Sequence, residues 1–470
     1  MLEQMRQLIS SAALLPPGSH VLCAVSGGAD SVCLLHALYH LRPSLKFSLS
    51  AAHYDHGLRG EDSTRDAGFV EQFVSLCCGE QRLPDGRVLP PVKLYQGKGD
   101  VGKEAARTGA GIEETARILR YAFLRRAAQQ AGANLIATAH TADDNAETIL
   151  FHLSRGSGLR GLTGIAPRRD GLIRPLLTTT RHEIEDYLRY YALPHREDRT
   201  NSDDTYARNR IRHQVVPVLD GLFPGFSPRM SQVAARLRAD EDYLSDQARA
   251  VSGRAVRRDG GLAIPAAALA QAPGPLAVRA LRQLLDVLCG GDWTGSAVHL
   301  ESVLALCRTV GPSTQISMPH GLVARREYDN LVLAPAAQET LPICPLPLPG
   351  TIRAGPWTVE VTGALYRGEM QTPFDLWLAQ SEAPLTLRPR QTGDRLRLPG
   401  RPEKTVKKWL IDEKIPRSRR DLLPVLAAPC GIAAVAGLGP AAEHIPKPGQ
   451  PAWHIRFIQK PHGAEDNENT

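Results

Sequence analysis

The sequence predicts an α/β protein: an N-terminal, mostly parallel sheet with helices on both faces, then a helical middle module and a small α+β C-terminal module. Two observations predict the parallel sheet. Short apolar runs alternate with helical patterns through the first third of the chain, and the apolar runs end in polar residues. A third observation, the change of pattern beyond Pro217, predicts the two later modules.

The expected elements follow one another along the chain. Strands are expected in VLCAV, FSLSAAHYD, VKLY and NLIATAH, and helices after the loop SGGADS, through Phe69 and Val74, and in IEETARILRYAFLRRAAQQAG. Two helices, MSQVAARLRADEDYLSDQARAV and PLAVRALRQLLDVLCG, and a hairpin-like SMPHGLVARREYDNLVLAP come later. We therefore expect a domain at 1–217, a helical domain at 218–334, a linker with strands at 335–382, a basic domain at 383–460 and a disordered tail at 461–470.

Composition narrows the class of protein. The 470 residues carry a formal charge of +7, which permits a nucleic-acid partner. The eight cysteines include no CxxC pair, so a reducing, cytoplasmic compartment is expected rather than a disulfide framework. Glu3 and the early glycine loop leave no room for a removable signal, and proline and glycine interrupt the uncharged run 422–442. We expect two short buried strands in that run and no membrane segment.

The stretch VLCAVSGGADSVCLLHAL places a glycine loop between a strand and a helix. Gly27 and Gly28 allow a tight turn and close approach of a ligand, so that backbone N–H groups and the helix N-terminus can face an anion. A simple turn is the alternative, but it would not need the two hydroxyls and the carboxylate of Ser-Gly-Gly-x-Asp-Ser. We expect ATP to bind here.

A second glycine pattern, GKGDVGKE at 97–104, matches the spacing of a Walker A loop. Glu104 stands where that motif needs a serine or threonine for magnesium, and Asp100 would repel phosphates. A solvated loop is the better interpretation.

The segment AHTADDNAET combines several candidate groups for chemistry. If a helix begins here, His140, Asp144 and Glu147 share one face, with Asp143 beside them. The alternative is an acidic first turn that complements the helix dipole. Arg208, in RNxxR with Asn209 and Arg212, could clamp a phosphate. His53 could line a nucleotide pocket or could be a structural histidine at the end of a strand.

Several motifs together carry a resemblance to a known family. SGGADS resembles the pyrophosphate loop of ATP-pyrophosphatases. In order along the chain, HYDHGLRGEDSTRD, EETARILRY, AHTADDNAETIL, RPLL and DRTNSDDTYARNRIRHQVVP resemble the tRNA(Ile)-lysidine synthetase family. The match covers the first 217 residues closely and resumes in LRPRQTGDRLRLPGRPEKTVKKWLIDEKIPRSRRDLLPVL. The resemblance implies an adenine nucleotide α-hydrolase-like fold for the catalytic domain and a tRNA-positioning role for the helical one.

The resemblance also implies a reaction. ATP would adenylate the C2 oxygen of the wobble cytidine in the CAU anticodon of an isoleucine tRNA, and the ε-amine of free L-lysine would then displace AMP. The resulting lysidine reads AUA, so the tRNA changes its identity from methionine to isoleucine. A homodimer is possible.

The roles that the resemblance implies fall on positions of this sequence that match the motifs. Asp30 would hold Mg²⁺, a hard ion that prefers oxygen ligands. The expected catalytic residues are Asp30, Asp144, Glu147 and Arg208. The lysine-binding candidates are Asp143, Asp144 and Glu147. The expected ATP-binding residues are Ser26, Gly27, Gly28, Ala29, Asp30, Ser31, His53 and His140.

The stretch Thr386–Arg420 is strongly basic, with twelve Lys or Arg against four Asp or Glu. Such a run is usually a solvated face, but here it includes Trp409 and lies in a separate module, as a grip on a phosphate backbone would. The candidates for tRNA binding are Arg388, Arg390, Arg395, Lys404, Lys407, Lys408, Arg417 and Arg420.

Two other classes of protein remain as alternatives. Another pyrophosphate-loop enzyme would share SGGADS, but a thiolase should show paired CxxC cysteines and a class II amidotransferase an N-terminal cysteine, and neither is present. The second alternative is a non-catalytic RNA-binding protein with a degenerate ATP site.

Overall fold

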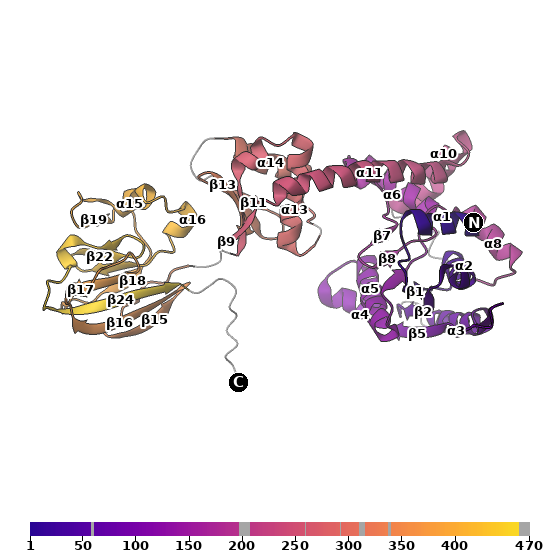
Figure 1. Ribbon diagram of the computed structural model, residues 1–470, viewed down its shortest axis with the longest axis horizontal. Helices are drawn as coiled ribbons and strands as arrows, with labels where there is room; N and C mark the ends of the chain where they lie inside the picture. The colour runs from indigo at the N-terminus through magenta and orange to yellow at the C-terminus, as the bar shows by residue number, and fades with distance from the viewer. Residues whose placement is uncertain are drawn as a thin grey trace. The chain divides into compact units, whose positions relative to one another are not determined.

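The computed structural model describes residues 1–57, 61–196, 207–258, 260–291, 293–309, 315–336 and 340–459, apart from the side chains of 61–64, 417 and 418. These residues form two compact units, Met1–Asp242 and Tyr243–Thr470 (Figure 1). The expected tail at 461–470 and the first part of the motif DRTNSDDTYARNRIRHQVVP, up to residue 206, lie outside the described residues.

The first unit is built around one six-stranded sheet in the order β5-β2-β1-β6-β8-β7. Every neighbouring pair is parallel except β7 with β8, which confirms the predicted mostly parallel sheet. Its strands are β1 (His20–Ala24), β2 (Ser48–Asp55), β5 (Lys93–Lys98), β6 (Leu135–Ala137), β7 (Arg168–Arg169) and β8 (Leu172–Ile173), and a separate hairpin is formed by β3 (Gln81–Arg82) and β4 (Val88–Leu89).

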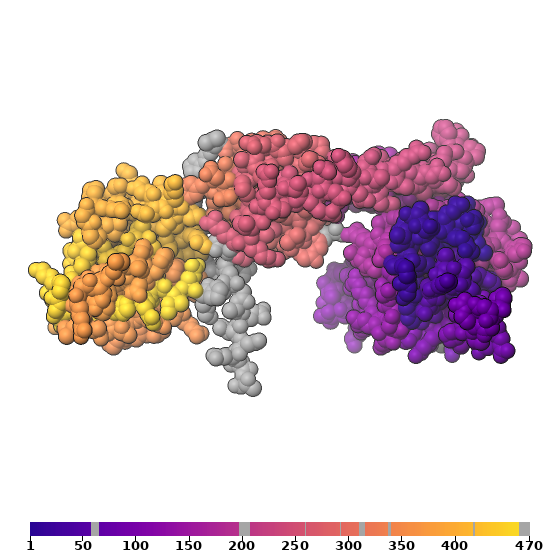
Figure 2. Space-filling view, in the orientation of Figure 1, coloured from indigo at the N-terminus to yellow at the C-terminus, as the bar shows by residue number. Residues whose placement is uncertain are grey.

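The helices of this unit are α1 (Leu2–Ser11), α2 (Ala29–Leu45), α3 (Glu61–Cys77), α4 (Val101–Thr108), α5 (Ile112–Ala131), α6 (Ala142–Ser154), α7 (Leu159–Leu162), α8 (Arg181–Tyr190), α9 (Ala207–Arg210), the π-helix η2 (Ile211–Val215) and α10 (Val216–Leu222). The helix α11 (Phe226–Ser252) begins in this unit, and its residues from Tyr243 onward belong to the second. α1 lies at the surface of the unit, in indigo in Figure 2, while its Met5 and Ile9 are buried in the core.

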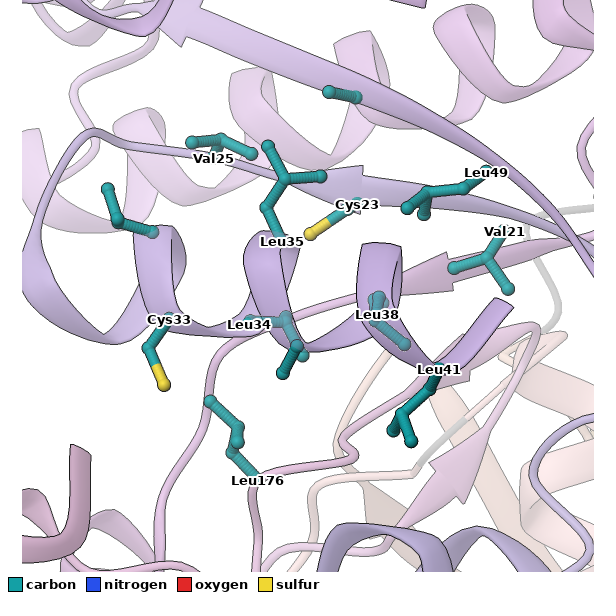
Figure 3. Packing of buried hydrophobic residues seen from close by; sticks show 14 of the residues in the cluster. Val21, Cys23, Val25, Cys33, Leu34, Leu35, Leu38, Leu41, Leu49 and Leu176 are labelled. Atoms are coloured by element: carbon teal, nitrogen blue, oxygen red, sulfur yellow. The ribbon is translucent and has the colours of Figure 1, made fainter. Parts of the chain in front are cut away.

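Both faces of the sheet are covered, because successive residues of β1 enter different cores. Val21 and Cys23 pack with α2 in the larger cluster, and Figure 3 shows Leu35 of α2 directed toward Cys23. Leu22, between them, packs instead with Phe123 and neighbouring residues of α5. Alternation with a period of two is what a strand buried on both faces requires.

The second unit combines helices with three larger sheets. Its first part contains α12 (Ala266–Ala270), α13 (Gly274–Cys289), α14 (Ala297–Arg308) and a five-stranded sheet of β9 (Val256–Arg258), β10 (Gly261–Pro265), β11 (Gln315–Met318), β12 (Leu322–Glu327) and β13 (Asn330–Pro335). The expected hairpin is β12 paired with β13. The strands β9 and β10 were not predicted, since each is too short to show a clear alternation.

The C-terminal part contains two further sheets around one core. Its elements are β14 (Cys344–Pro345), β15 (Gly350–Ala354), β16 (Trp357–Leu365), β17 (Asp375–Ala379), β18 (Thr386–Arg388), β19 (Arg395–Leu396), β20 (Lys404–Thr405), α15 (Val406–Asp412), α16 (Arg417–Arg420), β21 (Val425–Ala428), β22 (Gly431–Val435), β23 (Gly439–Pro440), the 3₁₀ turn η3 (Ala442–His444) and β24 (Pro451–Gln459).

The range 335–382, expected to be a linker with strands, does contain strands, but they pack as part of a folded module. β16 and β17 both pair with β24, and Trp357, Val359 and Leu376 are buried in the same core as Leu387 and Val425. Strands β14–β17 therefore belong to the C-terminal module, because their apolar faces complete its core. The proline-rich composition at 335–350 concealed this.

The uncharged run 422–442 forms β21 and β22, as predicted, and the additional short strand β23. No helix among the described residues is long and apolar enough to cross a membrane.

The GKGDVGKE pattern lies at the end of β5 and the start of α4. The Asp100 side chain accepts a hydrogen bond from the Lys103 N–H at 2.9 Å, so a carboxylate already caps this helix. Gly97 is needed for packing, because a Cβ there would lie 2.3 Å from the Phe123 ring.

We predict that Gly97→Ala lowers the free energy of unfolding by about 1–3 kcal/mol, the usual cost of overpacking, as measured by urea denaturation of the full chain. Gly102→Ala is the matched control, since it lies in α4 and a Cβ there meets only Asp100 Oδ1, at 3.5 Å. The control should be neutral or slightly stabilising, and neither variant should change ATP affinity. Loss of ATP binding in Gly102→Ala alone would support the Walker interpretation.

Candidate functional site

The glycine loop joins β1 to α2 and is held by its own serines. Ser31 Oγ accepts hydrogen bonds from the N–H groups of Ser26 and Gly27, at 3.1 and 3.2 Å, and donates to the Gly28 carbonyl at 2.9 Å. Ser26 Oγ accepts from the Gly28 N–H at 3.3 Å. Gly27 has a φ of +96°, a conformation that favours glycine. The hydroxyls of Ser26 and Ser31, which were expected to contact phosphates, therefore form hydrogen bonds within the loop and hold its shape.

The loop also leads directly into the N-terminus of α2, which can face a ligand. Ala29 and Asp30 stand in the first turn of this helix, where N–H groups have no intrahelical acceptor. Free donors and the positive end of the helix dipole suit an anion at this point.

Asp30 is brought close to the acidic residues of α6. Burial raises the pKa of its carboxyl to about 6, the charges of Asp144 and Asp143 add to this, and those of Arg181 and Arg212 oppose it. Residues from the ends of β1 and β6 therefore share one electrostatic environment, as expected for adjacent parallel strands.

Asp144 is fixed from two sides. Its Oδ2 accepts from the Thr141 N–H at 2.9 Å in a capping box, and its Oδ1 receives Arg212 at 3.0 Å. Burial by itself raises the pKa of Asp144, but the Thr141 hydrogen bond and the electrostatic interactions with His140, Arg181 and Arg212 lower it below the usual value. Asp144 is therefore ionised at neutral pH.

Glu147 lies one turn further along α6 and is only 1% exposed. Arg212 reaches both of its oxygens, with Nε 2.5 Å from Oε1 and Nη2 3.0 Å from Oε2. Arg208 adds a longer contact from Nε to Oε2 at 3.3 Å. Both arginines come from the segment α9–η2, where a π-helical turn begins just before Arg212.

Arg212 was not among the expected catalytic residues, although RNxxR contains it. Its side chain is 18% exposed, against 47% for Arg208, and it joins Asp144 to Glu147. Burial lowers its pKa, but the bonds to Glu147 and the charges of Asp144 and Asp30 raise it above the usual value. The spacing of RNxxR could have indicated two arginines on one helical face.

Asp143 has a different place from its neighbour. One carboxylate oxygen accepts from the Arg181 N–H at 2.8 Å, and the other accepts from Ser227 Oγ at 2.7 Å. These contacts cap the start of α8 and hold the start of α11. The structure thus gives Asp143 an architectural role, which its candidate role in lysine binding did not anticipate.

The histidines lie at the ends of β2 and β6. His53 Nδ1 is 2.8 Å from the Val25 carbonyl and donates to it, while its Nε2 is buried without a hydrogen-bond partner among the described residues. His140 Nδ1 is 3.0 Å from Thr138 Oγ1, and burial lowers its pKa to about 4. His140 is therefore neutral at pH 7 and suits a contact with a base or ribose.

The residues fit ATP and Mg²⁺. Among the described residues no cluster of three or more His, Cys, Asp or Glu could hold a metal by itself. Mg²⁺ bound with a nucleotide commonly takes one or two carboxylates, the rest of its shell being phosphate oxygens and water. Asp30 beside the glycine loop supplies such a carboxylate, and the unpartnered His53 Nε2 marks an acceptor that a bound group could use.

The basic candidates of the C-terminal module divide into two groups. Most of the arginines are used internally: Arg388 holds Asp394 through two bonds of 2.9 Å, Arg390 pairs with Asp421 at 2.8 Å, and Arg395 pairs with Glu403 at 3.0 Å. Lys404 pairs with Asp412 at 2.7 Å over the Trp409 ring.

Two of the remaining candidates face solvent. Lys407 and Lys408, in the first turn of α15, are exposed and form no ion pair with any residue that the structure describes. Arg420 donates from Nε to the Ile415 carbonyl at 2.8 Å. The side chain of Arg417 lies outside the described part of the chain.

Comparison with known proteins covers both ends of the chain. Residues 1–219 match the model of a PP-loop domain, and residues 385–457 match that of the TilS substrate C-terminal domain. The tRNA(Ile)-lysidine synthase of Geobacillus kaustophilus is 34% identical, covering 98% of this chain and 99% of its own length. The enzymes of the same name from Symbiobacterium thermophilum and Geobacter sulfurreducens are 33% and 35% identical, over 99% and 90% of this chain.

A solved TilS C-terminal domain is also similar. It is 24% identical, covers 25% of this chain and 96% of its own length, and gives a TM-score of 0.22.

The network around Glu147 makes a prediction about stability. Arg212→Met should lower the free energy of unfolding by about 3–5 kcal/mol, since it removes the main partner of a buried carboxylate. In urea denaturation, the double variant Arg212→Met/Glu147→Gln should lose less than Arg212→Met alone, because the more deeply buried of the two carboxylates that Arg212 pairs with is then neutral. If the loss of stability in the double variant equalled the sum of the losses in Arg212→Met and Glu147→Gln, the two residues would not be coupled.

Proposed function

Because the chain belongs to the tRNA(Ile)-lysidine synthase family of ligase-type tRNA-modifying enzymes, we propose that it joins free L-lysine to C2 of the wobble cytidine in a CAU-anticodon isoleucine tRNA. ATP adenylates the cytidine first, and lysine then displaces AMP. The lysidine formed pairs with adenine, so the tRNA reads AUA. The eight cysteines are free and include no CxxC pair, as suits a reducing compartment, and we propose a cytoplasmic location.

One observation carries the proposal: the glycine loop, Asp30 and the acid pair Asp144–Glu147 share one electrostatic environment in the first unit. Adenylation needs a phosphate site with a metal carboxylate, and aminolysis needs carboxylates for an ammonium group. The arrangement supports both steps at one place, so the adenylated cytidine would not have to move.

In the first step, the first-turn N–H groups of α2 would receive the phosphates and Asp30 would hold Mg²⁺. When bound, Mg²⁺ neutralises phosphate charge. Asp30 must be ionised for this role, and the arginines near it favour that form against the effect of burial. His140 and His53 would line the nucleoside side of the site.

In the second step, Asp144 and Glu147 would bind lysine. The reference pKa of its ε-ammonium is about 10.4, so a carboxylate must take the proton before the amine attacks. Two arginines, Arg208 and Arg212, contact Glu147. The contact with the half-exposed Arg208 is the longer of the two, at 3.3 Å. We assign Arg208 as the side chain that gives way to the lysine ammonium, while Arg212 keeps the two carboxylates in place.

The thiolase alternative is disfavoured by the cysteines. The sequence has no CxxC, and the cysteines nearest the loop, Cys23 and Cys33, are buried, which raises the pKa of each thiol. A buried neutral thiol is a poor nucleophile and a poor metal ligand. Formation of a homodimer, which the sequence left open, stays a prediction.

Incorporation of labelled lysine into an unmodified CAU-anticodon isoleucine tRNA, with ATP and Mg²⁺, tests the proposal. Lysine-dependent label, with AMP and pyrophosphate released in step, is expected. Asp30→Ala should abolish AMP release while tRNA still binds. Release of AMP by the unaltered enzyme without any transfer of lysine would show that another nucleophile is used.

We also predict that tRNA affinity depends on the solvent-facing lysines of α15. Lys407→Gln/Lys408→Gln should weaken tRNA binding and reduce the slope of log K against log salt by about 2, as expected for two lost phosphate contacts. Arg395→Gln is the matched control, because its guanidinium is already paired with Glu403, and its slope should change less. Equal slopes in the unaltered protein and the double variant, measured by filter binding, would place the grip elsewhere.

A further inference from the structure

The glycine loop lacks a cation of its own. Between Ser26 and Ser31 the only charged residue is Asp30, whereas many phosphate loops carry a lysine. The N–H groups of Ser26, Gly27 and Gly28 are bonded to serine hydroxyls within the loop. The negative charge of a bound triphosphate therefore needs a positive side chain from another part of the chain.

The segment that follows α8 returns to this loop and brings an arginine. The Arg196 N–H donates to the Gly27 carbonyl at 2.9 Å, and Arg196 forms a parallel bridge with Gly28. A Cβ built on Gly27 would lie 3.8 Å from Cγ of Arg196. The stem of the side chain therefore rests directly on the loop, and backbone contacts fix it there.

The guanidinium of Arg196 is held by an exchangeable partner. Its Nε is 3.0 Å from Oδ1 of Asp66, on α3, and the two side chains are 45% and 25% exposed. An ion pair in contact with water contributes little to stability. Phosphate oxygens can therefore replace Asp66 at small cost, whereas replacing the buried partners of Arg212 would be expensive.

The other arginines near the loop have different surroundings. Arg212 is bonded to both Asp144 and Glu147. The charge of Arg181 lowers the pKa of Asp30, and the Arg181 backbone N–H donates a hydrogen bond to the Asp143 carboxylate. The atoms nearest to a Cβ built on Gly27 belong to Phe69, Val70 and Arg196, and not to Arg181 or Arg212.

We propose that Arg196 is the cation of the glycine loop: it binds the β- and γ-phosphates of ATP, and it exchanges its ion pair with Asp66 for phosphate oxygens when the nucleotide enters. The planar guanidinium suits phosphate because it donates two parallel hydrogen bonds. After adenylation, the Arg196 guanidinium pairs with Asp66 again. Pyrophosphate then loses these hydrogen bonds and leaves more easily. This inference rests on the proposed use of ATP at this loop.

Calorimetric titration of the full chain with Mg²⁺-ATP and with AMP, without tRNA or lysine, tests the assignment. Arg196→Gln should weaken ATP binding about ten-fold, as loss of a charge-assisted hydrogen bond does, and should leave AMP binding unchanged. Arg196→Lys should restore part of the loss. Asp66→Asn should tighten ATP binding, because the competing carboxylate charge is removed.

Several outcomes would overturn the assignment. Equal weakening of ATP and AMP in Arg196→Gln would mean that the residue only shapes the loop. Unchanged ATP affinity in that variant, with weakened affinity in Arg181→Gln, would move the role to Arg181. Weaker ATP binding in Asp66→Asn would contradict the exchange. These titrations need no lysine transfer, so the inference can hold even if the proposed ligation fails, and the reverse also applies.

Discussion

The candidate site depends on one constraint: a carboxylate that is nearly excluded from water must be paired. Glu147 is 1% exposed, and Arg212 reaches both of its oxygens while also holding Asp144. An isolated buried carboxylate would take up a proton or destabilise the fold. The pairing with Arg212 therefore keeps two negative charges at the end of β6, where the proposed chemistry needs them, and ties α6 to the segment α9–η2.

The same constraint explains why neighbouring acidic residues have different roles. Asp143 accepts hydrogen bonds from α8 and α11, Asp144 closes the capping box and accepts from Arg212, and the Asp30 side chain forms no hydrogen bond or ion pair with any residue that the structure describes. Burial raises the pKa of Asp30, whereas bonds lower that of Asp144. A carboxylate without strong protein partners is the one most available to a metal ion, which is consistent with the role proposed for Asp30.

Charge in the C-terminal module shows how little a net surplus says about binding. The stretch Thr386–Arg420 is strongly basic in composition, yet Arg388, Arg390 and Arg395 each have an acidic partner. Arg388 and Asp394 are both largely buried and belong to the architecture of the module. Lys407 and Lys408 of α15 are exposed and pair with no acidic residue that the structure describes, so exposure and pairing, rather than net charge, decide which cations are accessible.

The sequence by itself determined the parallel sheet, the glycine loop and the acidic start of α6, because each depends on local patterns: alternation in β1, glycine at a positive φ, and a capping box within four residues. It also pointed to the family through motifs in order. It did not distinguish the role of Asp143 from that of Asp144, and it did not identify Arg212 as the main partner of Glu147. It also did not reveal that β14–β17 complete the C-terminal core. Only the tertiary structure decided these points, and it alone brought Arg196 onto the glycine loop, at Gly27, 169 residues earlier in the chain. The physical reason is that burial and pairing of charge are set by residues far apart in sequence, which leave no periodic signal along the chain.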